Sequence, residues 1–320
     1  MNNRRIPLAG LDMGRDTSKF LGKIHVQGVP RPPSAIHNIT SAMIHSRSNP
    51  QVRTIRRLRS SHGRRNTDLL LLEGPHLATA AAETGLALRH LLVTPDFQTR
   101  HAELVDHIEH ESGLPATAID PRRLREQADA DAPQGIVAIA EPPRTWKTAQ
   151  VTAPVLDPGL HLYVDGVQDP GNLGAMTRSA EAAGAASLLL SPGTARPGHP
   201  RALRASAGSL LRLQLWTDVG VDQLPAGARC LALTPHSLDP ESPPSVPLFS
   251  SDGEPVPLSP TDSIVLAVGS ESRGLSPPLL TRADLLLCIS TTPAVESLNA
   301  TVAASLALFE LRRLLVAEPA

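Results

Sequence analysis

The sequence predicts an α/β protein in which a smaller α/β unit precedes a doubly wound parallel sheet. Short apolar runs alternate with helix-like segments along both halves. In the second half these runs lack the two-residue alternation of half-exposed strands. Such continuous apolar runs are typical of parallel strands covered on both faces. Polar or glycine-bearing turns follow the second-half strands, where open α/β sheets place their ligands. A chain of 320 residues is long enough for two cores.

Residues 1–36 are predicted to form a basic, flexible tail. They hold several arginines, a proline cluster near the end and little apolar periodicity. The stretch lacks the apolar centre of a secretory signal. Asp12 and Asp16 argue against an organellar transit peptide without excluding one. We therefore expect a cytoplasmic protein and leave organellar targeting open.

Residues 37–141 are predicted to form the smaller α/β unit. Apolar residues with helical spacing predict a helix over Pro50–Arg59. Beyond it, apolar runs predict strands, and the segments between those runs predict helices. Strands are expected at 68–72, 88–94 and 134–139, and helices at 77–83 and 101–111.

Residues 160–320 are predicted to form the parallel-sheet domain, after a linker over 142–159. The linker is inferred from four prolines and few apolar runs. A segment rich in proline and serine, 236–263, is predicted to be an exposed insertion. Strands are expected at 161–164, 187–190, 229–233, 264–268 and 285–289, and helices at 175–183, 201–211 and 298–316.

The composition favours a globular protein with aliphatic cores, because hydrophobic residues make up 41% and aromatic residues only 2% of the chain. No apolar run approaches the roughly 20 residues needed to span a bilayer, so we expect no membrane segment. Cys230 and Cys288 lie in apolar, strand-like runs without metal-ligand spacing. We expect two buried thiols and no metal site.

Three motifs in the second half place polar side chains beside turns or at the start of a helix. They are Asp169-Pro-Gly-Asn172-Leu-Gly174 with Arg178, Gly269-Ser-Glu271-Ser-Arg273-Gly274-Leu275, and Glu296-Ser297-Leu298-Asn299. Taken singly, the amides and the serine can be helix caps, and the charged residues can be surface groups. Gly269 permits close approach of a ligand to the backbone, and Gly274 permits unusual torsions.

In order and spacing, these motifs resemble the SpoU/TrmH branch of the SPOUT methyltransferases. The sequence around Asn49-Pro50, Leu72-Glu-Gly74 and Pro133-Gln-Gly135 resembles the N-terminal substrate-binding domain of many of these enzymes, which is related to ribosomal protein L30e. The resemblance implies an L30e-like RNA-binding domain followed by a catalytic domain with a trefoil knot. It implies methylation of RNA ribose 2′-hydroxyls with S-adenosylmethionine as cofactor.

The resemblance also assigns roles to residues at matching positions. It implies that the catalytic residues are Asn172, Arg178, Glu271, Ser297 and Asn299, and that the cofactor is held by Val268, Gly269, Gly274, Ile289, Ser290 and Leu298. Arg178 is expected to matter most. Two roles are open for Arg178: removal of the proton from the ribose hydroxyl, or electrostatic stabilisation of the reacting oxygen. A guanidinium stays protonated in proteins and is a poor base, which is why the second role is considered.

A block from His37 to Thr67 contains seven arginines and no acidic residue. Such a block can be a solvated helix face. Beside a methyltransferase domain we favour an RNA surface, because arginines that neutralise phosphates release counterions. The expected RNA-binding residues are Arg53, Arg56, Arg57, Arg59, Arg64 and Arg65.

The expected partners are RNA and a second copy of the chain, since SpoU enzymes generally act as homodimers. By analogy with relatives that have an L30e-like domain, ribosomal RNA of the 23S type is preferred, with tRNA as the alternative substrate. Two further alternatives remain at this stage. One is a non-catalytic RNA-binding or ribosome-assembly factor, and the other is a methyltransferase that modifies RNA bases.

Overall fold

The computed structural model describes residues 43–65, 67–126, 134–235, 245–249, 258–259, 261–292, 294–295 and 297–316. These residues fall within one compact unit, 41–320. The predicted tail and most of the predicted insertion lie outside the described residues. Among the helices that the structure describes, none is long and apolar enough to cross a membrane.

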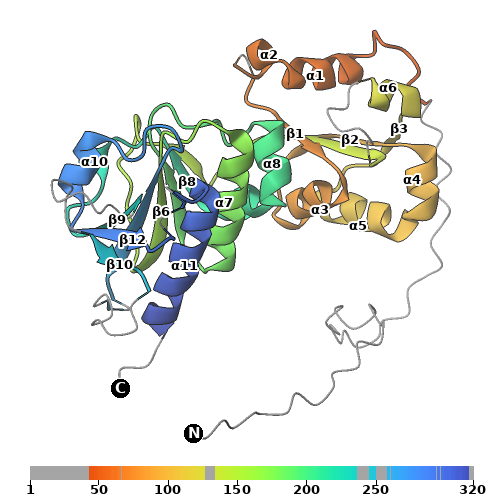
Figure 1. The fold of residues 1–320 in the computed structure, drawn as a ribbon. Coiled ribbons are helices and arrows are strands. Elements are labelled where there is room, and N and C mark those ends of the chain that lie inside the picture. Colours follow the sequence, from red (N-terminus) through yellow and green to blue (C-terminus); the bar gives the residue numbers. More distant parts are fainter. Residues whose placement is uncertain are drawn as a thin grey trace, which may run out of the picture. The chain divides into compact units, whose positions relative to one another are not determined.

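The first domain is built on a four-stranded sheet of order β1-β4-β2-β3 (Figure 1). Its central strand, β4, runs antiparallel to both neighbours, whereas β2 and β3 are parallel. The strands are β1 (Leu70–Glu73), β2 (Leu88–Val93), β3 (Thr117–Ala118) and β4 (Ile136–Ala140). The helices are α1 (Pro50–Arg59), α2 (Ser61–Arg65), α3 (Pro75–Glu83), α4 (Pro95–Arg100), α5 (Ala102–Ser112) and α6 (Pro121–Arg125).

Helix α1 has the bounds expected from its apolar spacing. The Asn49 side chain accepts a hydrogen bond from the Gln51 backbone N–H, and a proline occupies the first turn, where no intrahelical N–H bond is lost. Val52, Ile55 and Leu58 are buried in the core of the first domain. Each buried aliphatic side chain contributes about 1.5–3 kcal/mol, so this face orients the helix.

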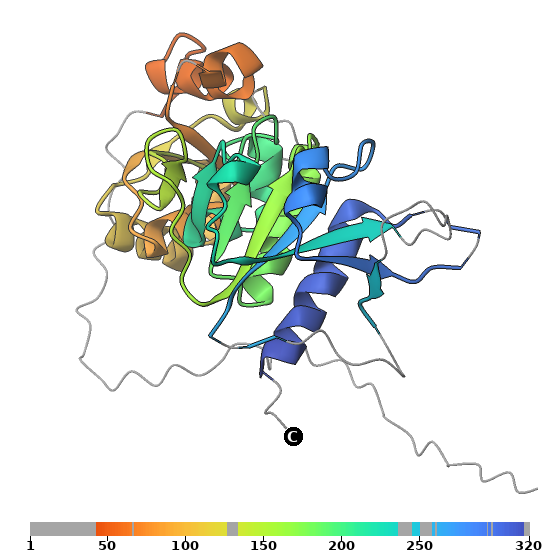
Figure 2. The ribbon, with the colours of Figure 1, turned by 90° about the vertical axis from the view of Figure 1, so that its left-hand side faces the viewer.

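The second domain is an eight-stranded, fully parallel sheet of order β10-β12-β9-β11-β6-β7-β8-β5. Figure 2 shows its strands side by side, and α11 packs against α7, β11 and β9. The strands are β5 (Trp146–Thr148), β6 (Gly159–Asp165), β7 (Ser187–Leu190), β8 (Gln214–Thr217), β9 (Arg229–Pro235), β10 (Val246–Pro247), β11 (Ser263–Gly269) and β12 (Leu285–Ile289). The helices are α7 (Pro170–Ala182), α8 (Pro200–Ser206), α9 (Ser209–Arg212), α10 (Pro277–Arg282), α11 (Ala300–Val316) and the short 3₁₀ turn η2 (Val221–Gln223). The α/β fold class with a parallel sheet is therefore confirmed.

The helix expected over 201–211 is instead two short helices. Ala207 and Gly208 have φ values of +48° and +94°, so the helix stops there and α9 starts in a new direction. A Cβ on Gly208 would lie 2.8 Å from the Ala80 Cβ of the first domain. The absence of a side chain at Gly208 therefore lets the two domains approach closely.

Part of the predicted linker belongs to the second sheet. Trp146–Thr148 forms β5, which pairs with β8, and the Trp146 indole N–H donates to the Leu210 carbonyl at 2.8 Å. In the predicted insertion, Val246–Pro247 forms β10 beside β12. Such two- or three-residue strands carry no periodicity of their own and are set by their neighbours in the sheet.

Helix α7 begins at Pro170, five residues earlier than expected, because the Asp169 side chain accepts the Asn172 backbone N–H at 2.9 Å. Asp169, rather than Asn172, is therefore the cap of this helix. The small residues of α7 permit close packing, as expected. A Cβ on Gly174 would lie 2.2 Å from the Ala202 carbonyl of α8, and Ser179 hydrogen-bonds Ser305 of α11 at 2.7 Å.

Candidate active site

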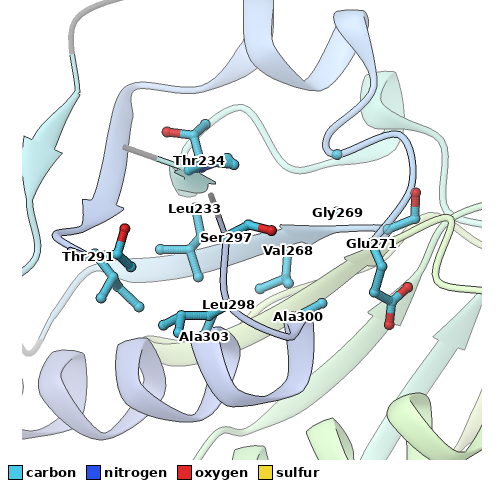
Figure 3. Close-up of a pocket in the computed structure, with 14 residues that line it drawn as sticks. Leu233, Thr234, Val268, Gly269, Glu271, Thr291, Ser297, Leu298, Ala300 and Ala303 are labelled. Atoms are coloured by element: carbon cyan, nitrogen blue, oxygen red, sulfur yellow. The ribbon is translucent and has the colours of Figure 1, made fainter. Parts of the chain in front are cut away.

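The carboxyl ends of β9, β11 and β12 meet at one edge of the second sheet. The parallel register places Val268 beside Leu233 and Ile289 beside Pro235. A cavity of about 150 Å³ lies there, closed by the start of α11 (Figure 3). Its lining consists of Leu233, Thr234, Pro235, Val268, Gly269, Ser270, Glu271, Gly274, Ile289, Thr291, Ser297, Leu298, Ala300 and Ala303.

The cavity has an apolar centre and a polar rim. Figure 3 shows Leu233, Val268 and Leu298 converging at its centre, while Glu271 lies to one side. Among the described residues that line the cavity, none is a lysine, arginine or histidine. The aliphatic centre suits an apolar ring, and Glu271 is the one formally charged side chain among the described lining residues.

The loop after β11 is closed on itself. The backbones of Ser270 and Gly274 exchange N–H···O bonds of 3.1 and 2.9 Å, and Gly274 has a φ of +64°. A Cβ on Gly269 would lie 2.3 Å from the carbonyl carbon of Gly274. Close backbone approach at Gly269 was expected from a ligand, but the group that approaches is the chain's own Gly274. The closed loop leaves Glu271 exposed.

Asn172 and Glu271 are brought together although 99 positions separate them. The Asn172 side-chain amide donates a hydrogen bond to Oε1 of Glu271. The Asn172 carbonyl accepts a weaker bond from the Thr301 hydroxyl at 3.4 Å. The first turn of α7 is thus tied both to the loop after β11 and to the start of α11.

The third motif is divided between the cavity and the helix cap. Ser297 and Leu298 line the cavity. The Asn299 side chain instead accepts the backbone N–H groups of Thr301 and Val302, at 2.9 and 3.3 Å, and so caps α11. Glu296 lies outside the described residues.

Arg178 projects from α7 and is exposed. Among the residues that the structure describes, it has no hydrogen-bond or ion-pair partner, and it does not line the cavity of its own chain. Its guanidinium is therefore available to a ligand or to a second copy of the chain.

Of the six residues expected to hold the cofactor, five line the cavity, and the sixth, Ser290, does not. Thr291 lines it instead. Sequence reasoning missed the β9 contribution from Leu233, Thr234 and Pro235. The apolar run over 229–233 was recognised as a strand, but strand order, which puts β9 next to β11, was not.

The arginines of this block differ in their exposure. Arg53, Arg56 and Arg57 are exposed on α1. Arg59 is only 13% exposed and pairs with Glu73, and Arg64 donates to the carbonyls of Leu58 and Arg59. The Arg59 guanidinium turns toward Glu73 at the end of β1 and is largely withdrawn from solvent, and its assignment as an RNA contact stays a prediction. The Arg65 side chain lies outside the described part of the chain.

Two family descriptions match this chain. Residues 159–309 match the SpoU rRNA Methylase family, and residues 49–138 match the MRM3-like substrate binding domain. An uncharacterized tRNA/rRNA methyltransferase of Synechocystis sp. is 31% identical over 280 residues, which are 85% of this chain and 94% of that protein. The 23S rRNA (guanosine(2553)-2′-O)-methyltransferase RlmP of Bacillus subtilis is 29% identical over 84% of this chain and 98% of that protein.

Solved structures with the same architecture include two that contain AdoMet. The AdoMet-bound rRNA methyltransferase from Sinorhizobium meliloti has a TM-score of 0.68 and 27% identity, covering 86% of this chain and 98% of that chain. The SpoU methyltransferase AviRb from Streptomyces viridochromogenes, in complex with AdoMet, has a TM-score of 0.66 and 25% identity, covering 83% and 98%.

Proposed function

Because this chain belongs to the SpoU rRNA Methylase family, we propose that it transfers a methyl group from S-adenosylmethionine to a ribose 2′-hydroxyl of 23S-type ribosomal RNA. One observation carries the proposal. The cavity at the ends of β9, β11 and β12 adjoins the hydrogen-bonded pair of Asn172 and Glu271, so a donor pocket and polar side chains lie together.

The residues of the cavity fit S-adenosylmethionine. The aliphatic side chains of Leu233, Val268 and Leu298 offer an apolar surface for an adenine ring. Among the described lining residues, the one formal charge is the carboxylate of Glu271, which tolerates the positive sulfonium. When bound, this cofactor supplies an electrophilic methyl group, and methyl transfer from it requires no metal.

The side chains around the cavity are proposed to align the RNA and stabilise charge. Glu271 and Asn172 orient the ribose at the mouth of the cavity, and Ser297 offers a hydroxyl within it. Arg178 stabilises the negative charge that develops on the 2′-oxygen, since a guanidinium stays protonated and is a poor base. Asn299 acts through the helix cap, by fixing the start of α11 next to Leu298.

We propose that the enzyme is a homodimer, with α11 in the interface. Val302, Leu306 and Phe309 form one apolar stripe and are 49%, 41% and 49% exposed. The opposite face of α11, with Ala304 and Leu308, is buried in the core. We propose that in this dimer Arg178 completes the active site of the partner subunit, since it does not line the cavity of its own chain. Phe309→Glu should yield monomers by light scattering and lose transfer, and a fully dimeric variant would contradict this interface.

We also propose that the chain around the cavity forms the trefoil knot of the SPOUT fold. Pulling the two chain ends apart would tighten a knot rather than extend every residue. The unfolded contour length should then fall short of the roughly 3.3–3.6 Å per residue expected of an open chain. Full extension would exclude a knot.

The domain limits of 37–141 and 160–320 stay predictions, with β5 now assigned to the second domain. A cytoplasmic location is likewise proposed, and bacterial relatives that modify ribosomal RNA are consistent with it. Fractionation of cells that express the full chain would test it, and recovery in an organelle or membrane fraction would contradict it.

The decisive experiment is methylation of ribosomal RNA, followed by nuclease digestion and mass spectrometry. We expect one additional 2′-O-methylated nucleoside, which is absent when the cofactor is omitted. A methyl group on a base, or transfer only to tRNA, would overturn the substrate assignment. Binding of RNA without affinity for S-adenosylmethionine would favour the non-catalytic factor.

A further inference from the structure

Glu73, at the end of β1, is held between two arginines from distant parts of the chain. Its Oε1 accepts a hydrogen bond from Nη2 of Arg59 on α1, and its Oε2 accepts one from Nη1 of Arg204 on α8. The side chains of Glu73 and Arg59 are each 13% exposed, and that of Arg204 is 30% exposed. One partly buried carboxylate thus links the first domain to the second.

Two glycines beside α8 lie close to side chains of the first domain. A Cβ on Gly198, just before α8, would lie 2.9 Å from Cδ2 of Leu70 on β1. A Cβ on Gly208, just after α8, would lie 2.8 Å from Cβ of Ala80 on α3. Glycines on both sides of α8 therefore let the first domain approach this helix closely, with the Glu73 ion pairs between them.

A continuous set of contacts leads from the first domain to the proposed catalytic side chains. Arg59 belongs to α1, whose outer face carries the exposed arginines. Glu73 pairs with Arg59 and also with Arg204 on α8. Helix α8 packs against α7, where Gly174 faces the Ala202 carbonyl. Helix α7 in turn carries Asn172 and Arg178.

We propose that Glu73 is a positioning residue that fixes the basic face of α1 relative to α7, so that RNA held by the first domain presents one ribose to the cavity. This inference rests on the proposed function. Glu73 does not act on the substrate itself. It acts through Arg59 and Arg204, which keep α1 and α8 in one arrangement.

The energetics of the pair of bonds support this role. Replacing the carboxylate by an amide would leave two like-charged guanidiniums at a partly buried junction with one neutral acceptor oxygen between them. The junction would then relax by moving the domains apart. A displacement of about 1 Å at a reacting centre costs on the order of 100-fold in rate, so a small shift would matter.

The test uses Glu73→Gln in the full-length enzyme, with Glu141→Gln as the matched control. Glu141 also pairs with an arginine of the first domain, Arg89, but these side chains are 44% and 59% exposed. We expect Glu73→Gln to bind S-adenosylmethionine and ribosomal RNA within about twofold of wild type. Its single-turnover rate of methyl transfer should fall roughly tenfold or more. The control should keep the wild-type rate.

A second pair of variants separates positioning from simple folding defects. Arg204→Lys keeps a cation opposite Glu73 and should recover part of the rate that Arg204→Gln loses. Arg204→Gln combined with Glu73→Gln should be no slower than either alone, because both remove the same link. If Glu73→Gln does not fold, the two Arg204 variants provide the same comparison of rate with binding.

Two results would overturn the inference. One is a Glu73→Gln rate within twofold of wild type, and the other is a parallel loss of rate and of both binding affinities, which a merely structural role predicts. Absence of methyl transfer by the wild-type enzyme would instead refute the proposed function, so the two failures are distinguishable.

Discussion

The Asn172 side-chain amide donates to the Glu271 carboxylate and so joins α7 to the loop after β11. The two side chains have different positions relative to the cavity. Glu271 lines it, whereas Asn172 does not line it and also bonds to the start of α11 through its carbonyl. The pair therefore sets where the carboxylate points at the mouth of the cavity.

Asn172→Asp should reduce methyl transfer at least tenfold, because it replaces the amide donor by a second carboxylate next to Glu271. Single-turnover kinetics would measure the rate, and a titration would show whether affinity for S-adenosylmethionine is kept. Combined with Glu271→Gln, the effect should be less than the product of the two single effects. Independent effects would mean that the pair does not act as a unit.

Arg178→Ala should abolish methyl transfer, with a loss of at least 100-fold, because the cation that stabilises the 2′-oxygen is removed. The free energy of unfolding should change by less than about 0.5 kcal/mol, since the side chain is exposed and has no partner among the described residues. Arg144→Ala, at another exposed arginine, serves as the control for both assays. Normal turnover of Arg178→Ala would refute its role.

Gly269→Ala should destabilise the protein by about 1–3 kcal/mol, because the new methyl group would overlap the Gly274 backbone at 2.3 Å. Opening the loop should also weaken binding of S-adenosylmethionine, which calorimetry can measure alongside thermal unfolding. Gly227→Ala is the control, since nothing lies within 4 Å of its added Cβ. Equal stability of the two variants would contradict the close approach described above.

Replacing Arg53 and Arg56 together by glutamine should weaken RNA binding and flatten its salt dependence. For each phosphate contact that is lost, the magnitude of the slope of log K against log salt should fall by about 0.7–0.9. The same measurement on Arg89→Gln, whose guanidinium already pairs with Glu141, should leave the slope unchanged. An unaltered slope in the double variant would show that this face of α1 does not contact phosphate.

Acidification should destabilise the second domain through His161. Its ring is 1% exposed and lies 2.8 Å from both the Ser187 hydroxyl and the Asp157 carbonyl, and burial lowers its pKa. Below about pH 6.5 the unfolded chain therefore binds a proton that the native ring does not.

The free energy of unfolding should fall as pH decreases from about 6.5 toward the native pKa of His161. Denaturant titrations of wild type and His161→Gln at several pH values would measure this slope. The variant should keep part of the slope, because burial also lowers the pKa of His90. An identical slope in both proteins would exclude His161 as a source.

Elements with strong local signals were predictable. Helix α1 matched its apolar spacing and its Asn49 cap, and the long second-half strands such as β11 matched their apolar runs. Short strands such as β3 and β10 could not be predicted. Two residues show no periodicity, and such a strand is defined by the neighbouring strand with which it pairs. The break at Ala207 was also missed, since alanine usually favours helix and its left-handed torsion comes from packing at the domain junction.

The sequence by itself determined the chemistry available to this protein. The residue types and their order around Asn172, Glu271 and Ser297 are local, and they suffice to identify a methyltransferase of this family. Tertiary structure decided which groups meet. The strand order places β9 beside β11. The ion pair with Glu73 leaves the Arg59 side chain largely buried, and the same carboxylate pairs with Arg204. Such pairings depend on distances across the folded chain, which the spacing of residues along the sequence does not contain.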